Sequence, residues 1–131
     1  MAAWSRPTPD LATWRAVEDP GARLRLGLGE LYRWYRETEP MTANVLRDAQ
    51  VLPALRAVVE GGLLRYLEEA GKVLTEPLAA RGRRRQRVDA ADLAAVDLHT
   101  WRSLAPLGDD DAADLAAGLV ELAADLPSGS S

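Results

Sequence analysis

The chain contains no cysteine and only one histidine, His99. The absence of cysteine excludes disulfide bonds, thiolate nucleophiles and cysteine-based metal sites. With one histidine and no HExxH motif, the sequence offers no recognisable metal site. It also has no Ser/His/Asp set, no glycine-rich phosphate loop and no pair of carboxylates at catalytic spacing. We therefore predict that the protein is not an enzyme and needs no metal or cofactor.

Long apolar runs and strand patterns are missing as well. No apolar run approaches the roughly 20 residues that span a membrane, and residues 1–10 lack the apolar core of a signal peptide. Nothing alternates with a period of two, and β-branched residues are scarce, which argues against strands. The length of 131 residues suits one domain. We predict a soluble, cytoplasmic, all-α domain over residues 1–126 and a disordered tail, residues 127–131.

The charge pattern argues against nucleic acid as the main partner. The net charge is −4, whereas nucleic-acid-binding domains usually carry a basic surplus. The exception is the run RGRRRQR, from Arg81 to Arg87, which could grip phosphates. No aromatic residue is interleaved for base stacking, and no helix-turn-helix surrounds the run. We therefore favour a solvated turn between helices that the acidic final helix partly neutralises.

Apolar spacing predicts a helical bundle of about five helices. A short helix is expected within residues 11–17. Asp19 and Pro20 have the residue types of an N-cap and a first helical position. The helix that follows carries leucines and Tyr35 on one face. Two glycines inside it, in the segment GLGE, cost about 1 kcal/mol each relative to alanine, which suggests that another element approaches the backbone there.

Further helix boundaries are predicted from capping residues and helix breakers. Thr38 should cap a separate short helix over residues 39–49. A longer helix should begin at Pro53 and kink or break at the Gly61-Gly62 pair. We expect the last two helices to be long. They cover residues 88–105 and 109–126, respectively.

The final helix is apolar on more than one side. One row combines leucines and alanines at core spacing, and a second row consists of Ala113, Ala117, Val120 and Ala124. A helix that is apolar on two sides is buried on two sides, and the second side suggests an isologous dimer. The predicted dimer-interface residues are Trp101, Leu104, Leu115, Leu119, Val120, Leu122 and Ala123.

Aromatic and polar side chains in the first half of the chain predict a small-molecule pocket. Tyr35, Met41 and Val45 would form an apolar wall, and a few polar groups would orient the ligand. Asn44 and Asp48 share a helix face. The alternatives are that Tyr35 is plain core and that the polar pair only caps helices or pairs with arginines. The predicted ligand-binding residues are Tyr35, Met41, Asn44, Val45, Asp48, Leu63, Tyr66, His99 and Arg102.

Three motifs follow one another in a familiar order. They are DP..RL…LY.WY….EPM..NVLRD between Asp19 and Asp48, HTWRSL from His99 to Leu104, and DDDAADLAAGLVELAADL in the final helix. Together they resemble the effector-binding domain of tetracycline-repressor-like (TetR/AcrR) transcriptional regulators. The resemblance implies an apolar small-molecule effector and a homodimer joined through the last two long helices. The family's helix-turn-helix is not present in this chain, so DNA contact would need a segment outside it.

Two functions follow from these observations. The leading hypothesis is the ligand-sensing and dimerisation domain of a TetR/AcrR-type regulator. The alternative is a stand-alone helical small-molecule-binding module, or a dominant-negative dimer partner that lacks DNA binding.

Overall fold

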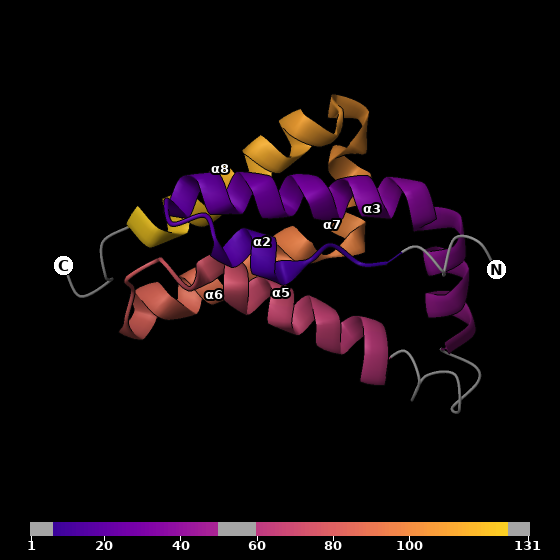
Figure 1. Ribbon diagram of the computed structural model, residues 1–131, viewed down its shortest axis with the longest axis horizontal. Helices are drawn as coiled ribbons and strands as arrows, with labels where there is room; N and C mark the ends of the chain where they lie inside the picture. The colour runs from indigo at the N-terminus through magenta and orange to yellow at the C-terminus, as the bar shows by residue number, and fades with distance from the viewer. Residues whose placement is uncertain (1–6, 50–59, 126–131) are drawn as a thin grey trace.

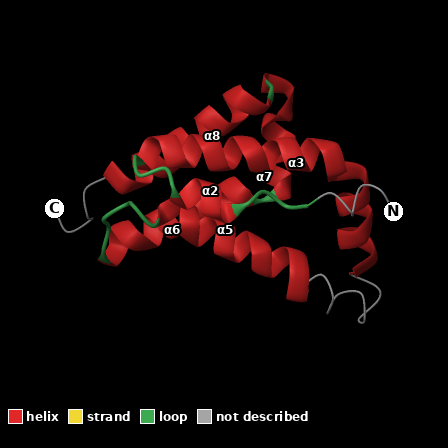
Figure 2. Ribbon diagram, in the orientation of Figure 1, coloured by secondary structure: helices red, strands yellow, loops and turns green. Residues whose placement is uncertain are grey.

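The computed structural model describes residues 7–49 and 60–125, without the side chains of residues 39–61. All regular structure in these ranges is helical (Figure 2), which confirms the all-α prediction. The elements are α2 (Leu11–Arg15), α3 (Pro20–Ala49), the π-helical turn η1 (Glu60–Leu64), α5 (Arg65–Thr75), α6 (Gly82–Val96), α7 (Leu98–Leu104), the 3-10 turn η2 (Ala105–Leu107) and α8 (Asp109–Asp125). None of the described helices has the length and hydropathy of a membrane-spanning segment. The predicted tail lies outside the described residues.

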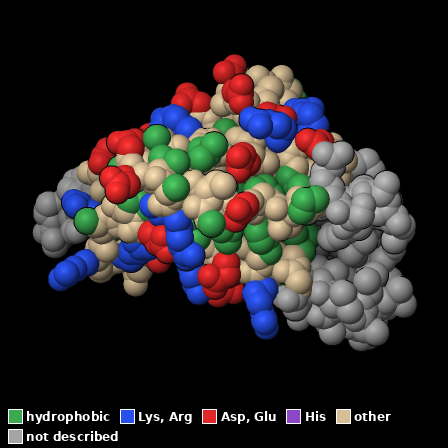
Figure 3. Space-filling view, in the orientation of Figure 1, with side chains coloured by type: hydrophobic (Ala, Val, Ile, Leu, Met, Phe, Trp, Pro, Cys, Tyr) green, Lys and Arg blue, Asp and Glu red, His purple; other side chains and the backbone are tan. Residues whose placement is uncertain are grey.

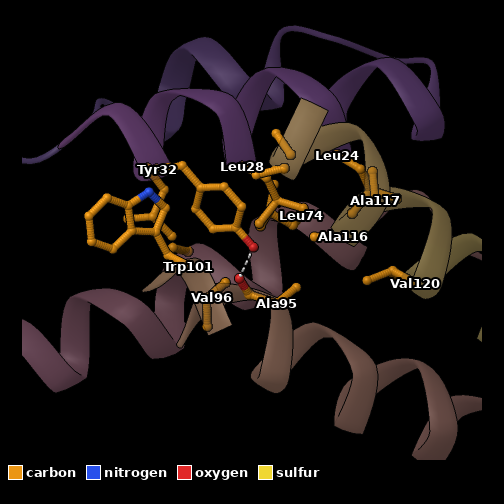
Figure 4. Packing of buried hydrophobic residues seen from close by; sticks show 14 of the residues in the cluster. Leu24, Leu28, Tyr32, Leu74, Ala95, Val96, Trp101, Ala116, Ala117 and Val120 are labelled. Atoms are coloured by element: carbon orange, nitrogen blue, oxygen red, sulfur yellow. Dashed lines mark hydrogen bonds between the residues drawn. The ribbon is translucent and has the colours of Figure 1, made fainter. Parts of the chain in front are cut away.

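The long helix α3 organises the bundle. Helix α8 packs along one side of it, α2 and α5 pack along another, and α6 contacts both α5 and α8 (Figure 1). The core fills the space between these helices (Figure 4). Its largest fully buried side chains are Trp14, Leu24, Leu28, Leu31, Tyr32, Tyr35 and Leu74.

The start of α3 follows the predicted capping. The Oδ2 atom of Asp19 accepts a hydrogen bond from the backbone N–H of Ala22 at 2.8 Å. The Asp19 carbonyl oxygen accepts the N–H of Arg23 at 2.9 Å. Pro20 occupies the first helical position, where its missing N–H costs nothing.

The predicted helix boundary at Thr38 is wrong, because α3 continues to Ala49. Thr38 is buried, and its hydroxyl donates to the Trp34 carbonyl oxygen one turn earlier at 2.8 Å. Threonine used in this way bonds back into the preceding turn and does not cap a new helix. Pro40 removes one backbone hydrogen bond from a helix interior, which bends a helix. Figure 1 shows the last part of α3 turning away from the axis of its first part.

Close approach to the α3 backbone occurs at one of its two internal glycines. A Cβ atom at Gly27 would overlap the Leu74 side chain and would lie 3.1 Å from ring carbons of Trp14. Gly27 therefore lets α2 and α5 pack directly on α3. At Gly29 the nearest atoms are 4.0 Å from such a Cβ atom, so the space there is ordinary.

All of the arginine run after Arg81 is helical, which corrects the prediction of a solvated turn. Gly82 is the first residue of α6 and has a φ of +59°, a backbone conformation that favours glycine. Arg85 then donates to the Leu78 carbonyl oxygen at 3.2 Å and pairs with Asp89 at 3.1 Å. Arginine is a good helix former, so the residues after Gly82 continue the helix that begins there.

The penultimate helix predicted over residues 88–105 is two helices, α6 and α7, with the break at Asp97. The Oδ1 atom of Asp97 accepts the backbone N–H of His99 at 3.0 Å and so caps α7. The interruption expected at Gly61-Gly62 takes the form of the π-helical turn η1.

The final helix α8 begins at Asp109 as predicted and is described to Asp125, but it buries the small residues of both predicted rows and not the leucines. Its buried residues are Ala112, Ala113, Ala116, Ala117, Val120 and Ala123. The leucines assigned to the core by spacing, Leu115, Leu119 and Leu122, are 46%, 53% and 56% exposed. Small side chains let α8 lie close to α3, and this close packing turns the leucines outward.

Ion pairs connect α8 to α3. Arg25 of α3 pairs with Asp114 at 2.6 Å and with Glu121 at 2.9 Å. Nearer the start of α8, Arg36 pairs with Asp109 at 2.9 Å. These carboxylates of the acidic final helix thus pair with arginines of α3. Figure 3 shows acidic and basic side chains interspersed on the face that carries α2 and α3.

Candidate functional site

An apolar cavity of about 560 Å³ lies between α3, η1–α5 and the corner at which α6 meets α7. Sites for drug-sized ligands usually measure about 300–1,000 Å³ and are mostly apolar with a few polar groups. The lining residues are Tyr35, Leu63, Leu64, Leu67, Glu68, Leu93, Val96, Asp97 and Leu98. The size and the lining both fit a small-molecule site.

Two tyrosines of α3 hold the α6–α7 corner in place. The Tyr32 hydroxyl donates to the Ala95 carbonyl oxygen at 2.6 Å (Figure 4), and the Tyr35 hydroxyl donates to the Val96 carbonyl oxygen. The last carbonyl groups of a helix have no partner within the helix. The tyrosines supply partners for two of them, and α3 thereby positions one wall of the cavity.

Aromatic packing holds the Tyr35 ring beside this corner. Its centroid lies 6.0 Å from that of the Trp101 ring and 5.8 Å from that of Trp34, in tilted arrangements. Such pairs stabilise ring positions beyond simple burial. Burial raises the pKa of the Tyr35 hydroxyl, and the carboxylate of Asp97 raises it further. Tyr35 therefore remains a neutral hydrogen-bond donor at the cavity wall.

The structure brings two of the predicted ligand-binding residues into the cavity wall, Tyr35 and Leu63. Tyr66 is half-buried outside the lining, and its hydroxyl donates to the Pro9 carbonyl oxygen at 2.7 Å. His99 and Arg102 are exposed on α7 and do not line the cavity. The predictions for Met41, Asn44, Val45 and Asp48 concern side chains outside the described part.

Sequence reasoning missed the other seven lining residues. Leu67 follows Leu63 by one helical turn, so i, i+4 spacing from Leu63 could have found it. Asp97 had a usable signal as well, because an aspartate before an apolar helical segment is a typical N-cap. Leu93 and Leu98 carried no such signal, since their place in the wall depends on the break between α6 and α7.

The predicted dimer-interface residues separate into buried and exposed groups. Trp101, Val120 and Ala123 are buried within this chain, and Leu104 is half-buried. Three leucines remain exposed on one face of α8, and we call this surface the α8 leucine row. It consists of Leu115, Leu119 and Leu122.

A second hollow, of about 580 Å³, lies between residues 7–13 and α3. Its lining includes the charged side chains of Asp10, Glu30, Arg33 and Glu37. The cavity beside Tyr35 is the more apolar of the two and the better candidate for an apolar ligand. Within the described residues, no group of His, Asp or Glu side chains is arranged to hold a metal ion.

Comparisons with protein-family models, with curated proteins and with solved structures found no match to this chain. The geometry of the cavity and the α8 leucine row therefore carry the functional proposal.

Proposed function

We propose that this chain is the ligand-sensing and dimerisation domain of a cytoplasmic TetR/AcrR-type transcriptional regulator and that its cavity binds an apolar small-molecule effector. The observation that carries the proposal is the apolar cavity bounded by α3, η1–α5 and the α6–α7 corner. The stand-alone binding module would use the same cavity, so a ligand-binding test applies to both hypotheses.

The position of the cavity supports a sensing role. Its walls come from helices far apart in the sequence, including α3 and α6, which Tyr32 and Tyr35 connect. A ligand seated there would contact α3 and the α6–α7 corner together. A ligand can shift a conformational equilibrium only through differential contacts with the two states, and a site that joins several helices offers such contacts.

The α8 leucine row supports dimerisation. Burying one leucine side chain contributes about 1.5–3 kcal/mol, and the row exposes three leucines on one helix face. In an isologous pair each copy contributes the same surface, so the number of buried leucines doubles. We propose that two α8 helices pack together through this row.

A neutral apolar probe tests the cavity. N-phenyl-1-naphthylamine should bind saturably at one site per chain, as measured by its fluorescence. The variant Leu67→Trp fills part of the wall and should weaken binding by about tenfold or more, equal to ~1.4 kcal/mol. The matched control is Leu26→Trp, a half-exposed leucine of α3 that does not line the cavity. Equal affinities for both variants, each folded by circular dichroism, would count against the cavity as the binding site.

Analytical ultracentrifugation tests the dimer. At tens of micromolar we expect the wild-type chain to be a dimer and Leu119→Glu to be mainly a monomer, because the change places a charge in an apolar interface. Leu93→Glu, at a 70% exposed leucine of α6, should leave the dimer intact. A wild-type chain that stays monomeric at these concentrations contradicts the dimer proposal.

A further inference from the structure

We infer that the ligand of the cavity is a lipophilic cation, an apolar body that carries one amine or quaternary ammonium group. This inference rests on the proposed function, because it assigns the ligand class of the same cavity. It depends on the charges that line the cavity and on the orientation of α6.

Among the described residues of the cavity wall, all charge is negative. Of the nine lining residues, Glu68 and Asp97 are the ionisable acids, and no lysine, arginine or histidine is among them. The remaining wall is leucine, valine and the neutral phenol of Tyr35. A carboxylate at the edge of an apolar, low-dielectric space attracts a cation more strongly than it would in bulk water, and it repels an anion. The wall therefore complements a hydrocarbon with a positive end.

The orientation of α6 adds to this negative potential. The helix ends at Val96, which lies in the wall, so its negative dipole end faces the cavity corner. Its last turn contains no basic residue to neutralise that end. The Tyr32 and Tyr35 hydroxyls donate to Ala95 and Val96, but they are neutral donors and bring no positive charge.

The two acids differ in their neighbours. Glu68 pairs with Lys72 at 3.6 Å on the surface of α5, and both side chains are more than half exposed, so water screens this pair. Asp97 accepts the His99 N–H, a backbone bond, and no described cation pairs with it. Its charge also reaches the cavity wall, since it contributes to the raised pKa of Tyr35. Asp97 is the main partner that we assign to the cation, and Glu68 is the second.

A matched ligand series tests the sign of the charge. Decylammonium, 1-decanol and decanoate share one hydrocarbon chain and differ at the polar end, and isothermal titration calorimetry below their micellar concentrations measures the three affinities. We expect decylammonium to bind about tenfold more tightly than 1-decanol, equal to ~1.4 kcal/mol, and decanoate to bind most weakly. Added salt should reduce the preference for the cation.

Two charge-removing variants locate the effect. Asp97→Asn keeps a good N-cap for α7, and Glu68→Gln keeps the side-chain length. Each should reduce the preference for decylammonium over 1-decanol, and the double variant should abolish it while 1-decanol still binds. Glu69→Gln removes an equal charge from an exposed residue of α5 outside the lining and should leave the preference unchanged.

The outcomes separate this inference from the proposed function. Equal binding of the three ligands, or a preference that survives the double variant, overturns the cationic ligand and leaves the apolar cavity standing. If none of the three ligands binds to the folded protein, the proposed ligand-sensing function fails, and the ligand class fails with it.

Discussion

Replacing Arg23 with methionine is expected to destabilise the fold by about 3–5 kcal/mol, because it removes a buried guanidinium group that makes four hydrogen bonds. Arg23 is 7% exposed. Its guanidinium donates to the carbonyl oxygens of Arg15, Val17 and Val73 at 3.0, 2.9 and 3.0 Å, and to the Glu76 carboxylate at 3.0 Å. These contacts tie the α2–α3 connection and the end of α5 to α3. Methionine can fill the space but leaves the three carbonyl groups without these donors.

Urea unfolding monitored by circular dichroism measures this loss. The matched control is Arg25→Met on the same helix. Its side chain is 40% exposed, and it pairs with Asp114 and Glu121. Exposed ion pairs contribute about 1 kcal/mol or less, so this variant should lose far less stability than the Arg23 variant. Similar losses of unfolding free energy in both variants would show that the hydrogen bonds of Arg23 do not stabilise the fold more than exposed ion pairs do.

Replacing Asp92 with asparagine is expected to stabilise the protein at pH 8 by up to about 4 kcal/mol, since its pKa is raised by about three units and each unit corresponds to 1.36 kcal/mol. Asp92 is 7% exposed, and its Oδ1 atom has no hydrogen-bond partner within the described part of the chain. Burial and, to a smaller extent, the Asp89 carboxylate raise its pKa from 3.8 to about 7, against a lowering by Arg85. The carboxyl group packs against α5 at Gly71, where no Cβ atom would fit.

The sign of the pH dependence follows from the raised pKa of Asp92. The folded state binds the Asp92 proton more tightly than the unfolded state does, so this group's contribution to stability is complete below pH 4. It is lost as the pH rises from about 4 to about 7. Asparagine is neutral throughout, so the variant lacks this loss.

The free energy of unfolding of wild type and Asp92→Asn, measured from pH 5 to pH 8, tests the prediction. The difference between the two proteins should grow over this range and level off above pH 7. Asp110→Asn, at a carboxylate whose side chain is 93% exposed, should show no comparable trend. A constant difference between wild type and Asp92→Asn would mean that Asp92 is ionised in the folded protein throughout.

The candidate site was predictable only where local periodicity places a residue. Tyr35 and Leu63 were found because their helix faces follow from i, i+3 and i+4 spacing. The α6–α7 corner was not found, because the break at Asp97 also depends on hydroxyl groups from Tyr32 and Tyr35, more than 60 residues earlier. Local spacing carries no information about partners so distant in the sequence. Residues 88–105 were therefore predicted to form one helix.

The α8 surface shows the same limit. The spacing of apolar residues predicted the helix and its two apolar rows, but it did not show which side chains would be buried. The structure buries the alanines and Val120 and leaves Leu115 and Leu119 exposed. Whether the small side chains or the leucines are buried depends on how closely α8 approaches α3, and Arg25 and Arg36 help to set that approach through their ion pairs with α8.

The sequence by itself determined the helical class, the cap at Asp19 and the start of α8 at Asp109. These features follow from interactions within a few residues, which spacing and capping chemistry describe. Only the tertiary structure decided that Thr38 lies inside a continuous helix, which of the two glycines allows close packing, which α8 side chains are buried and where the cavity lies. Those outcomes depend on contacts between helices distant in the chain, and such contacts override local preference when burial and hydrogen bonding outweigh it.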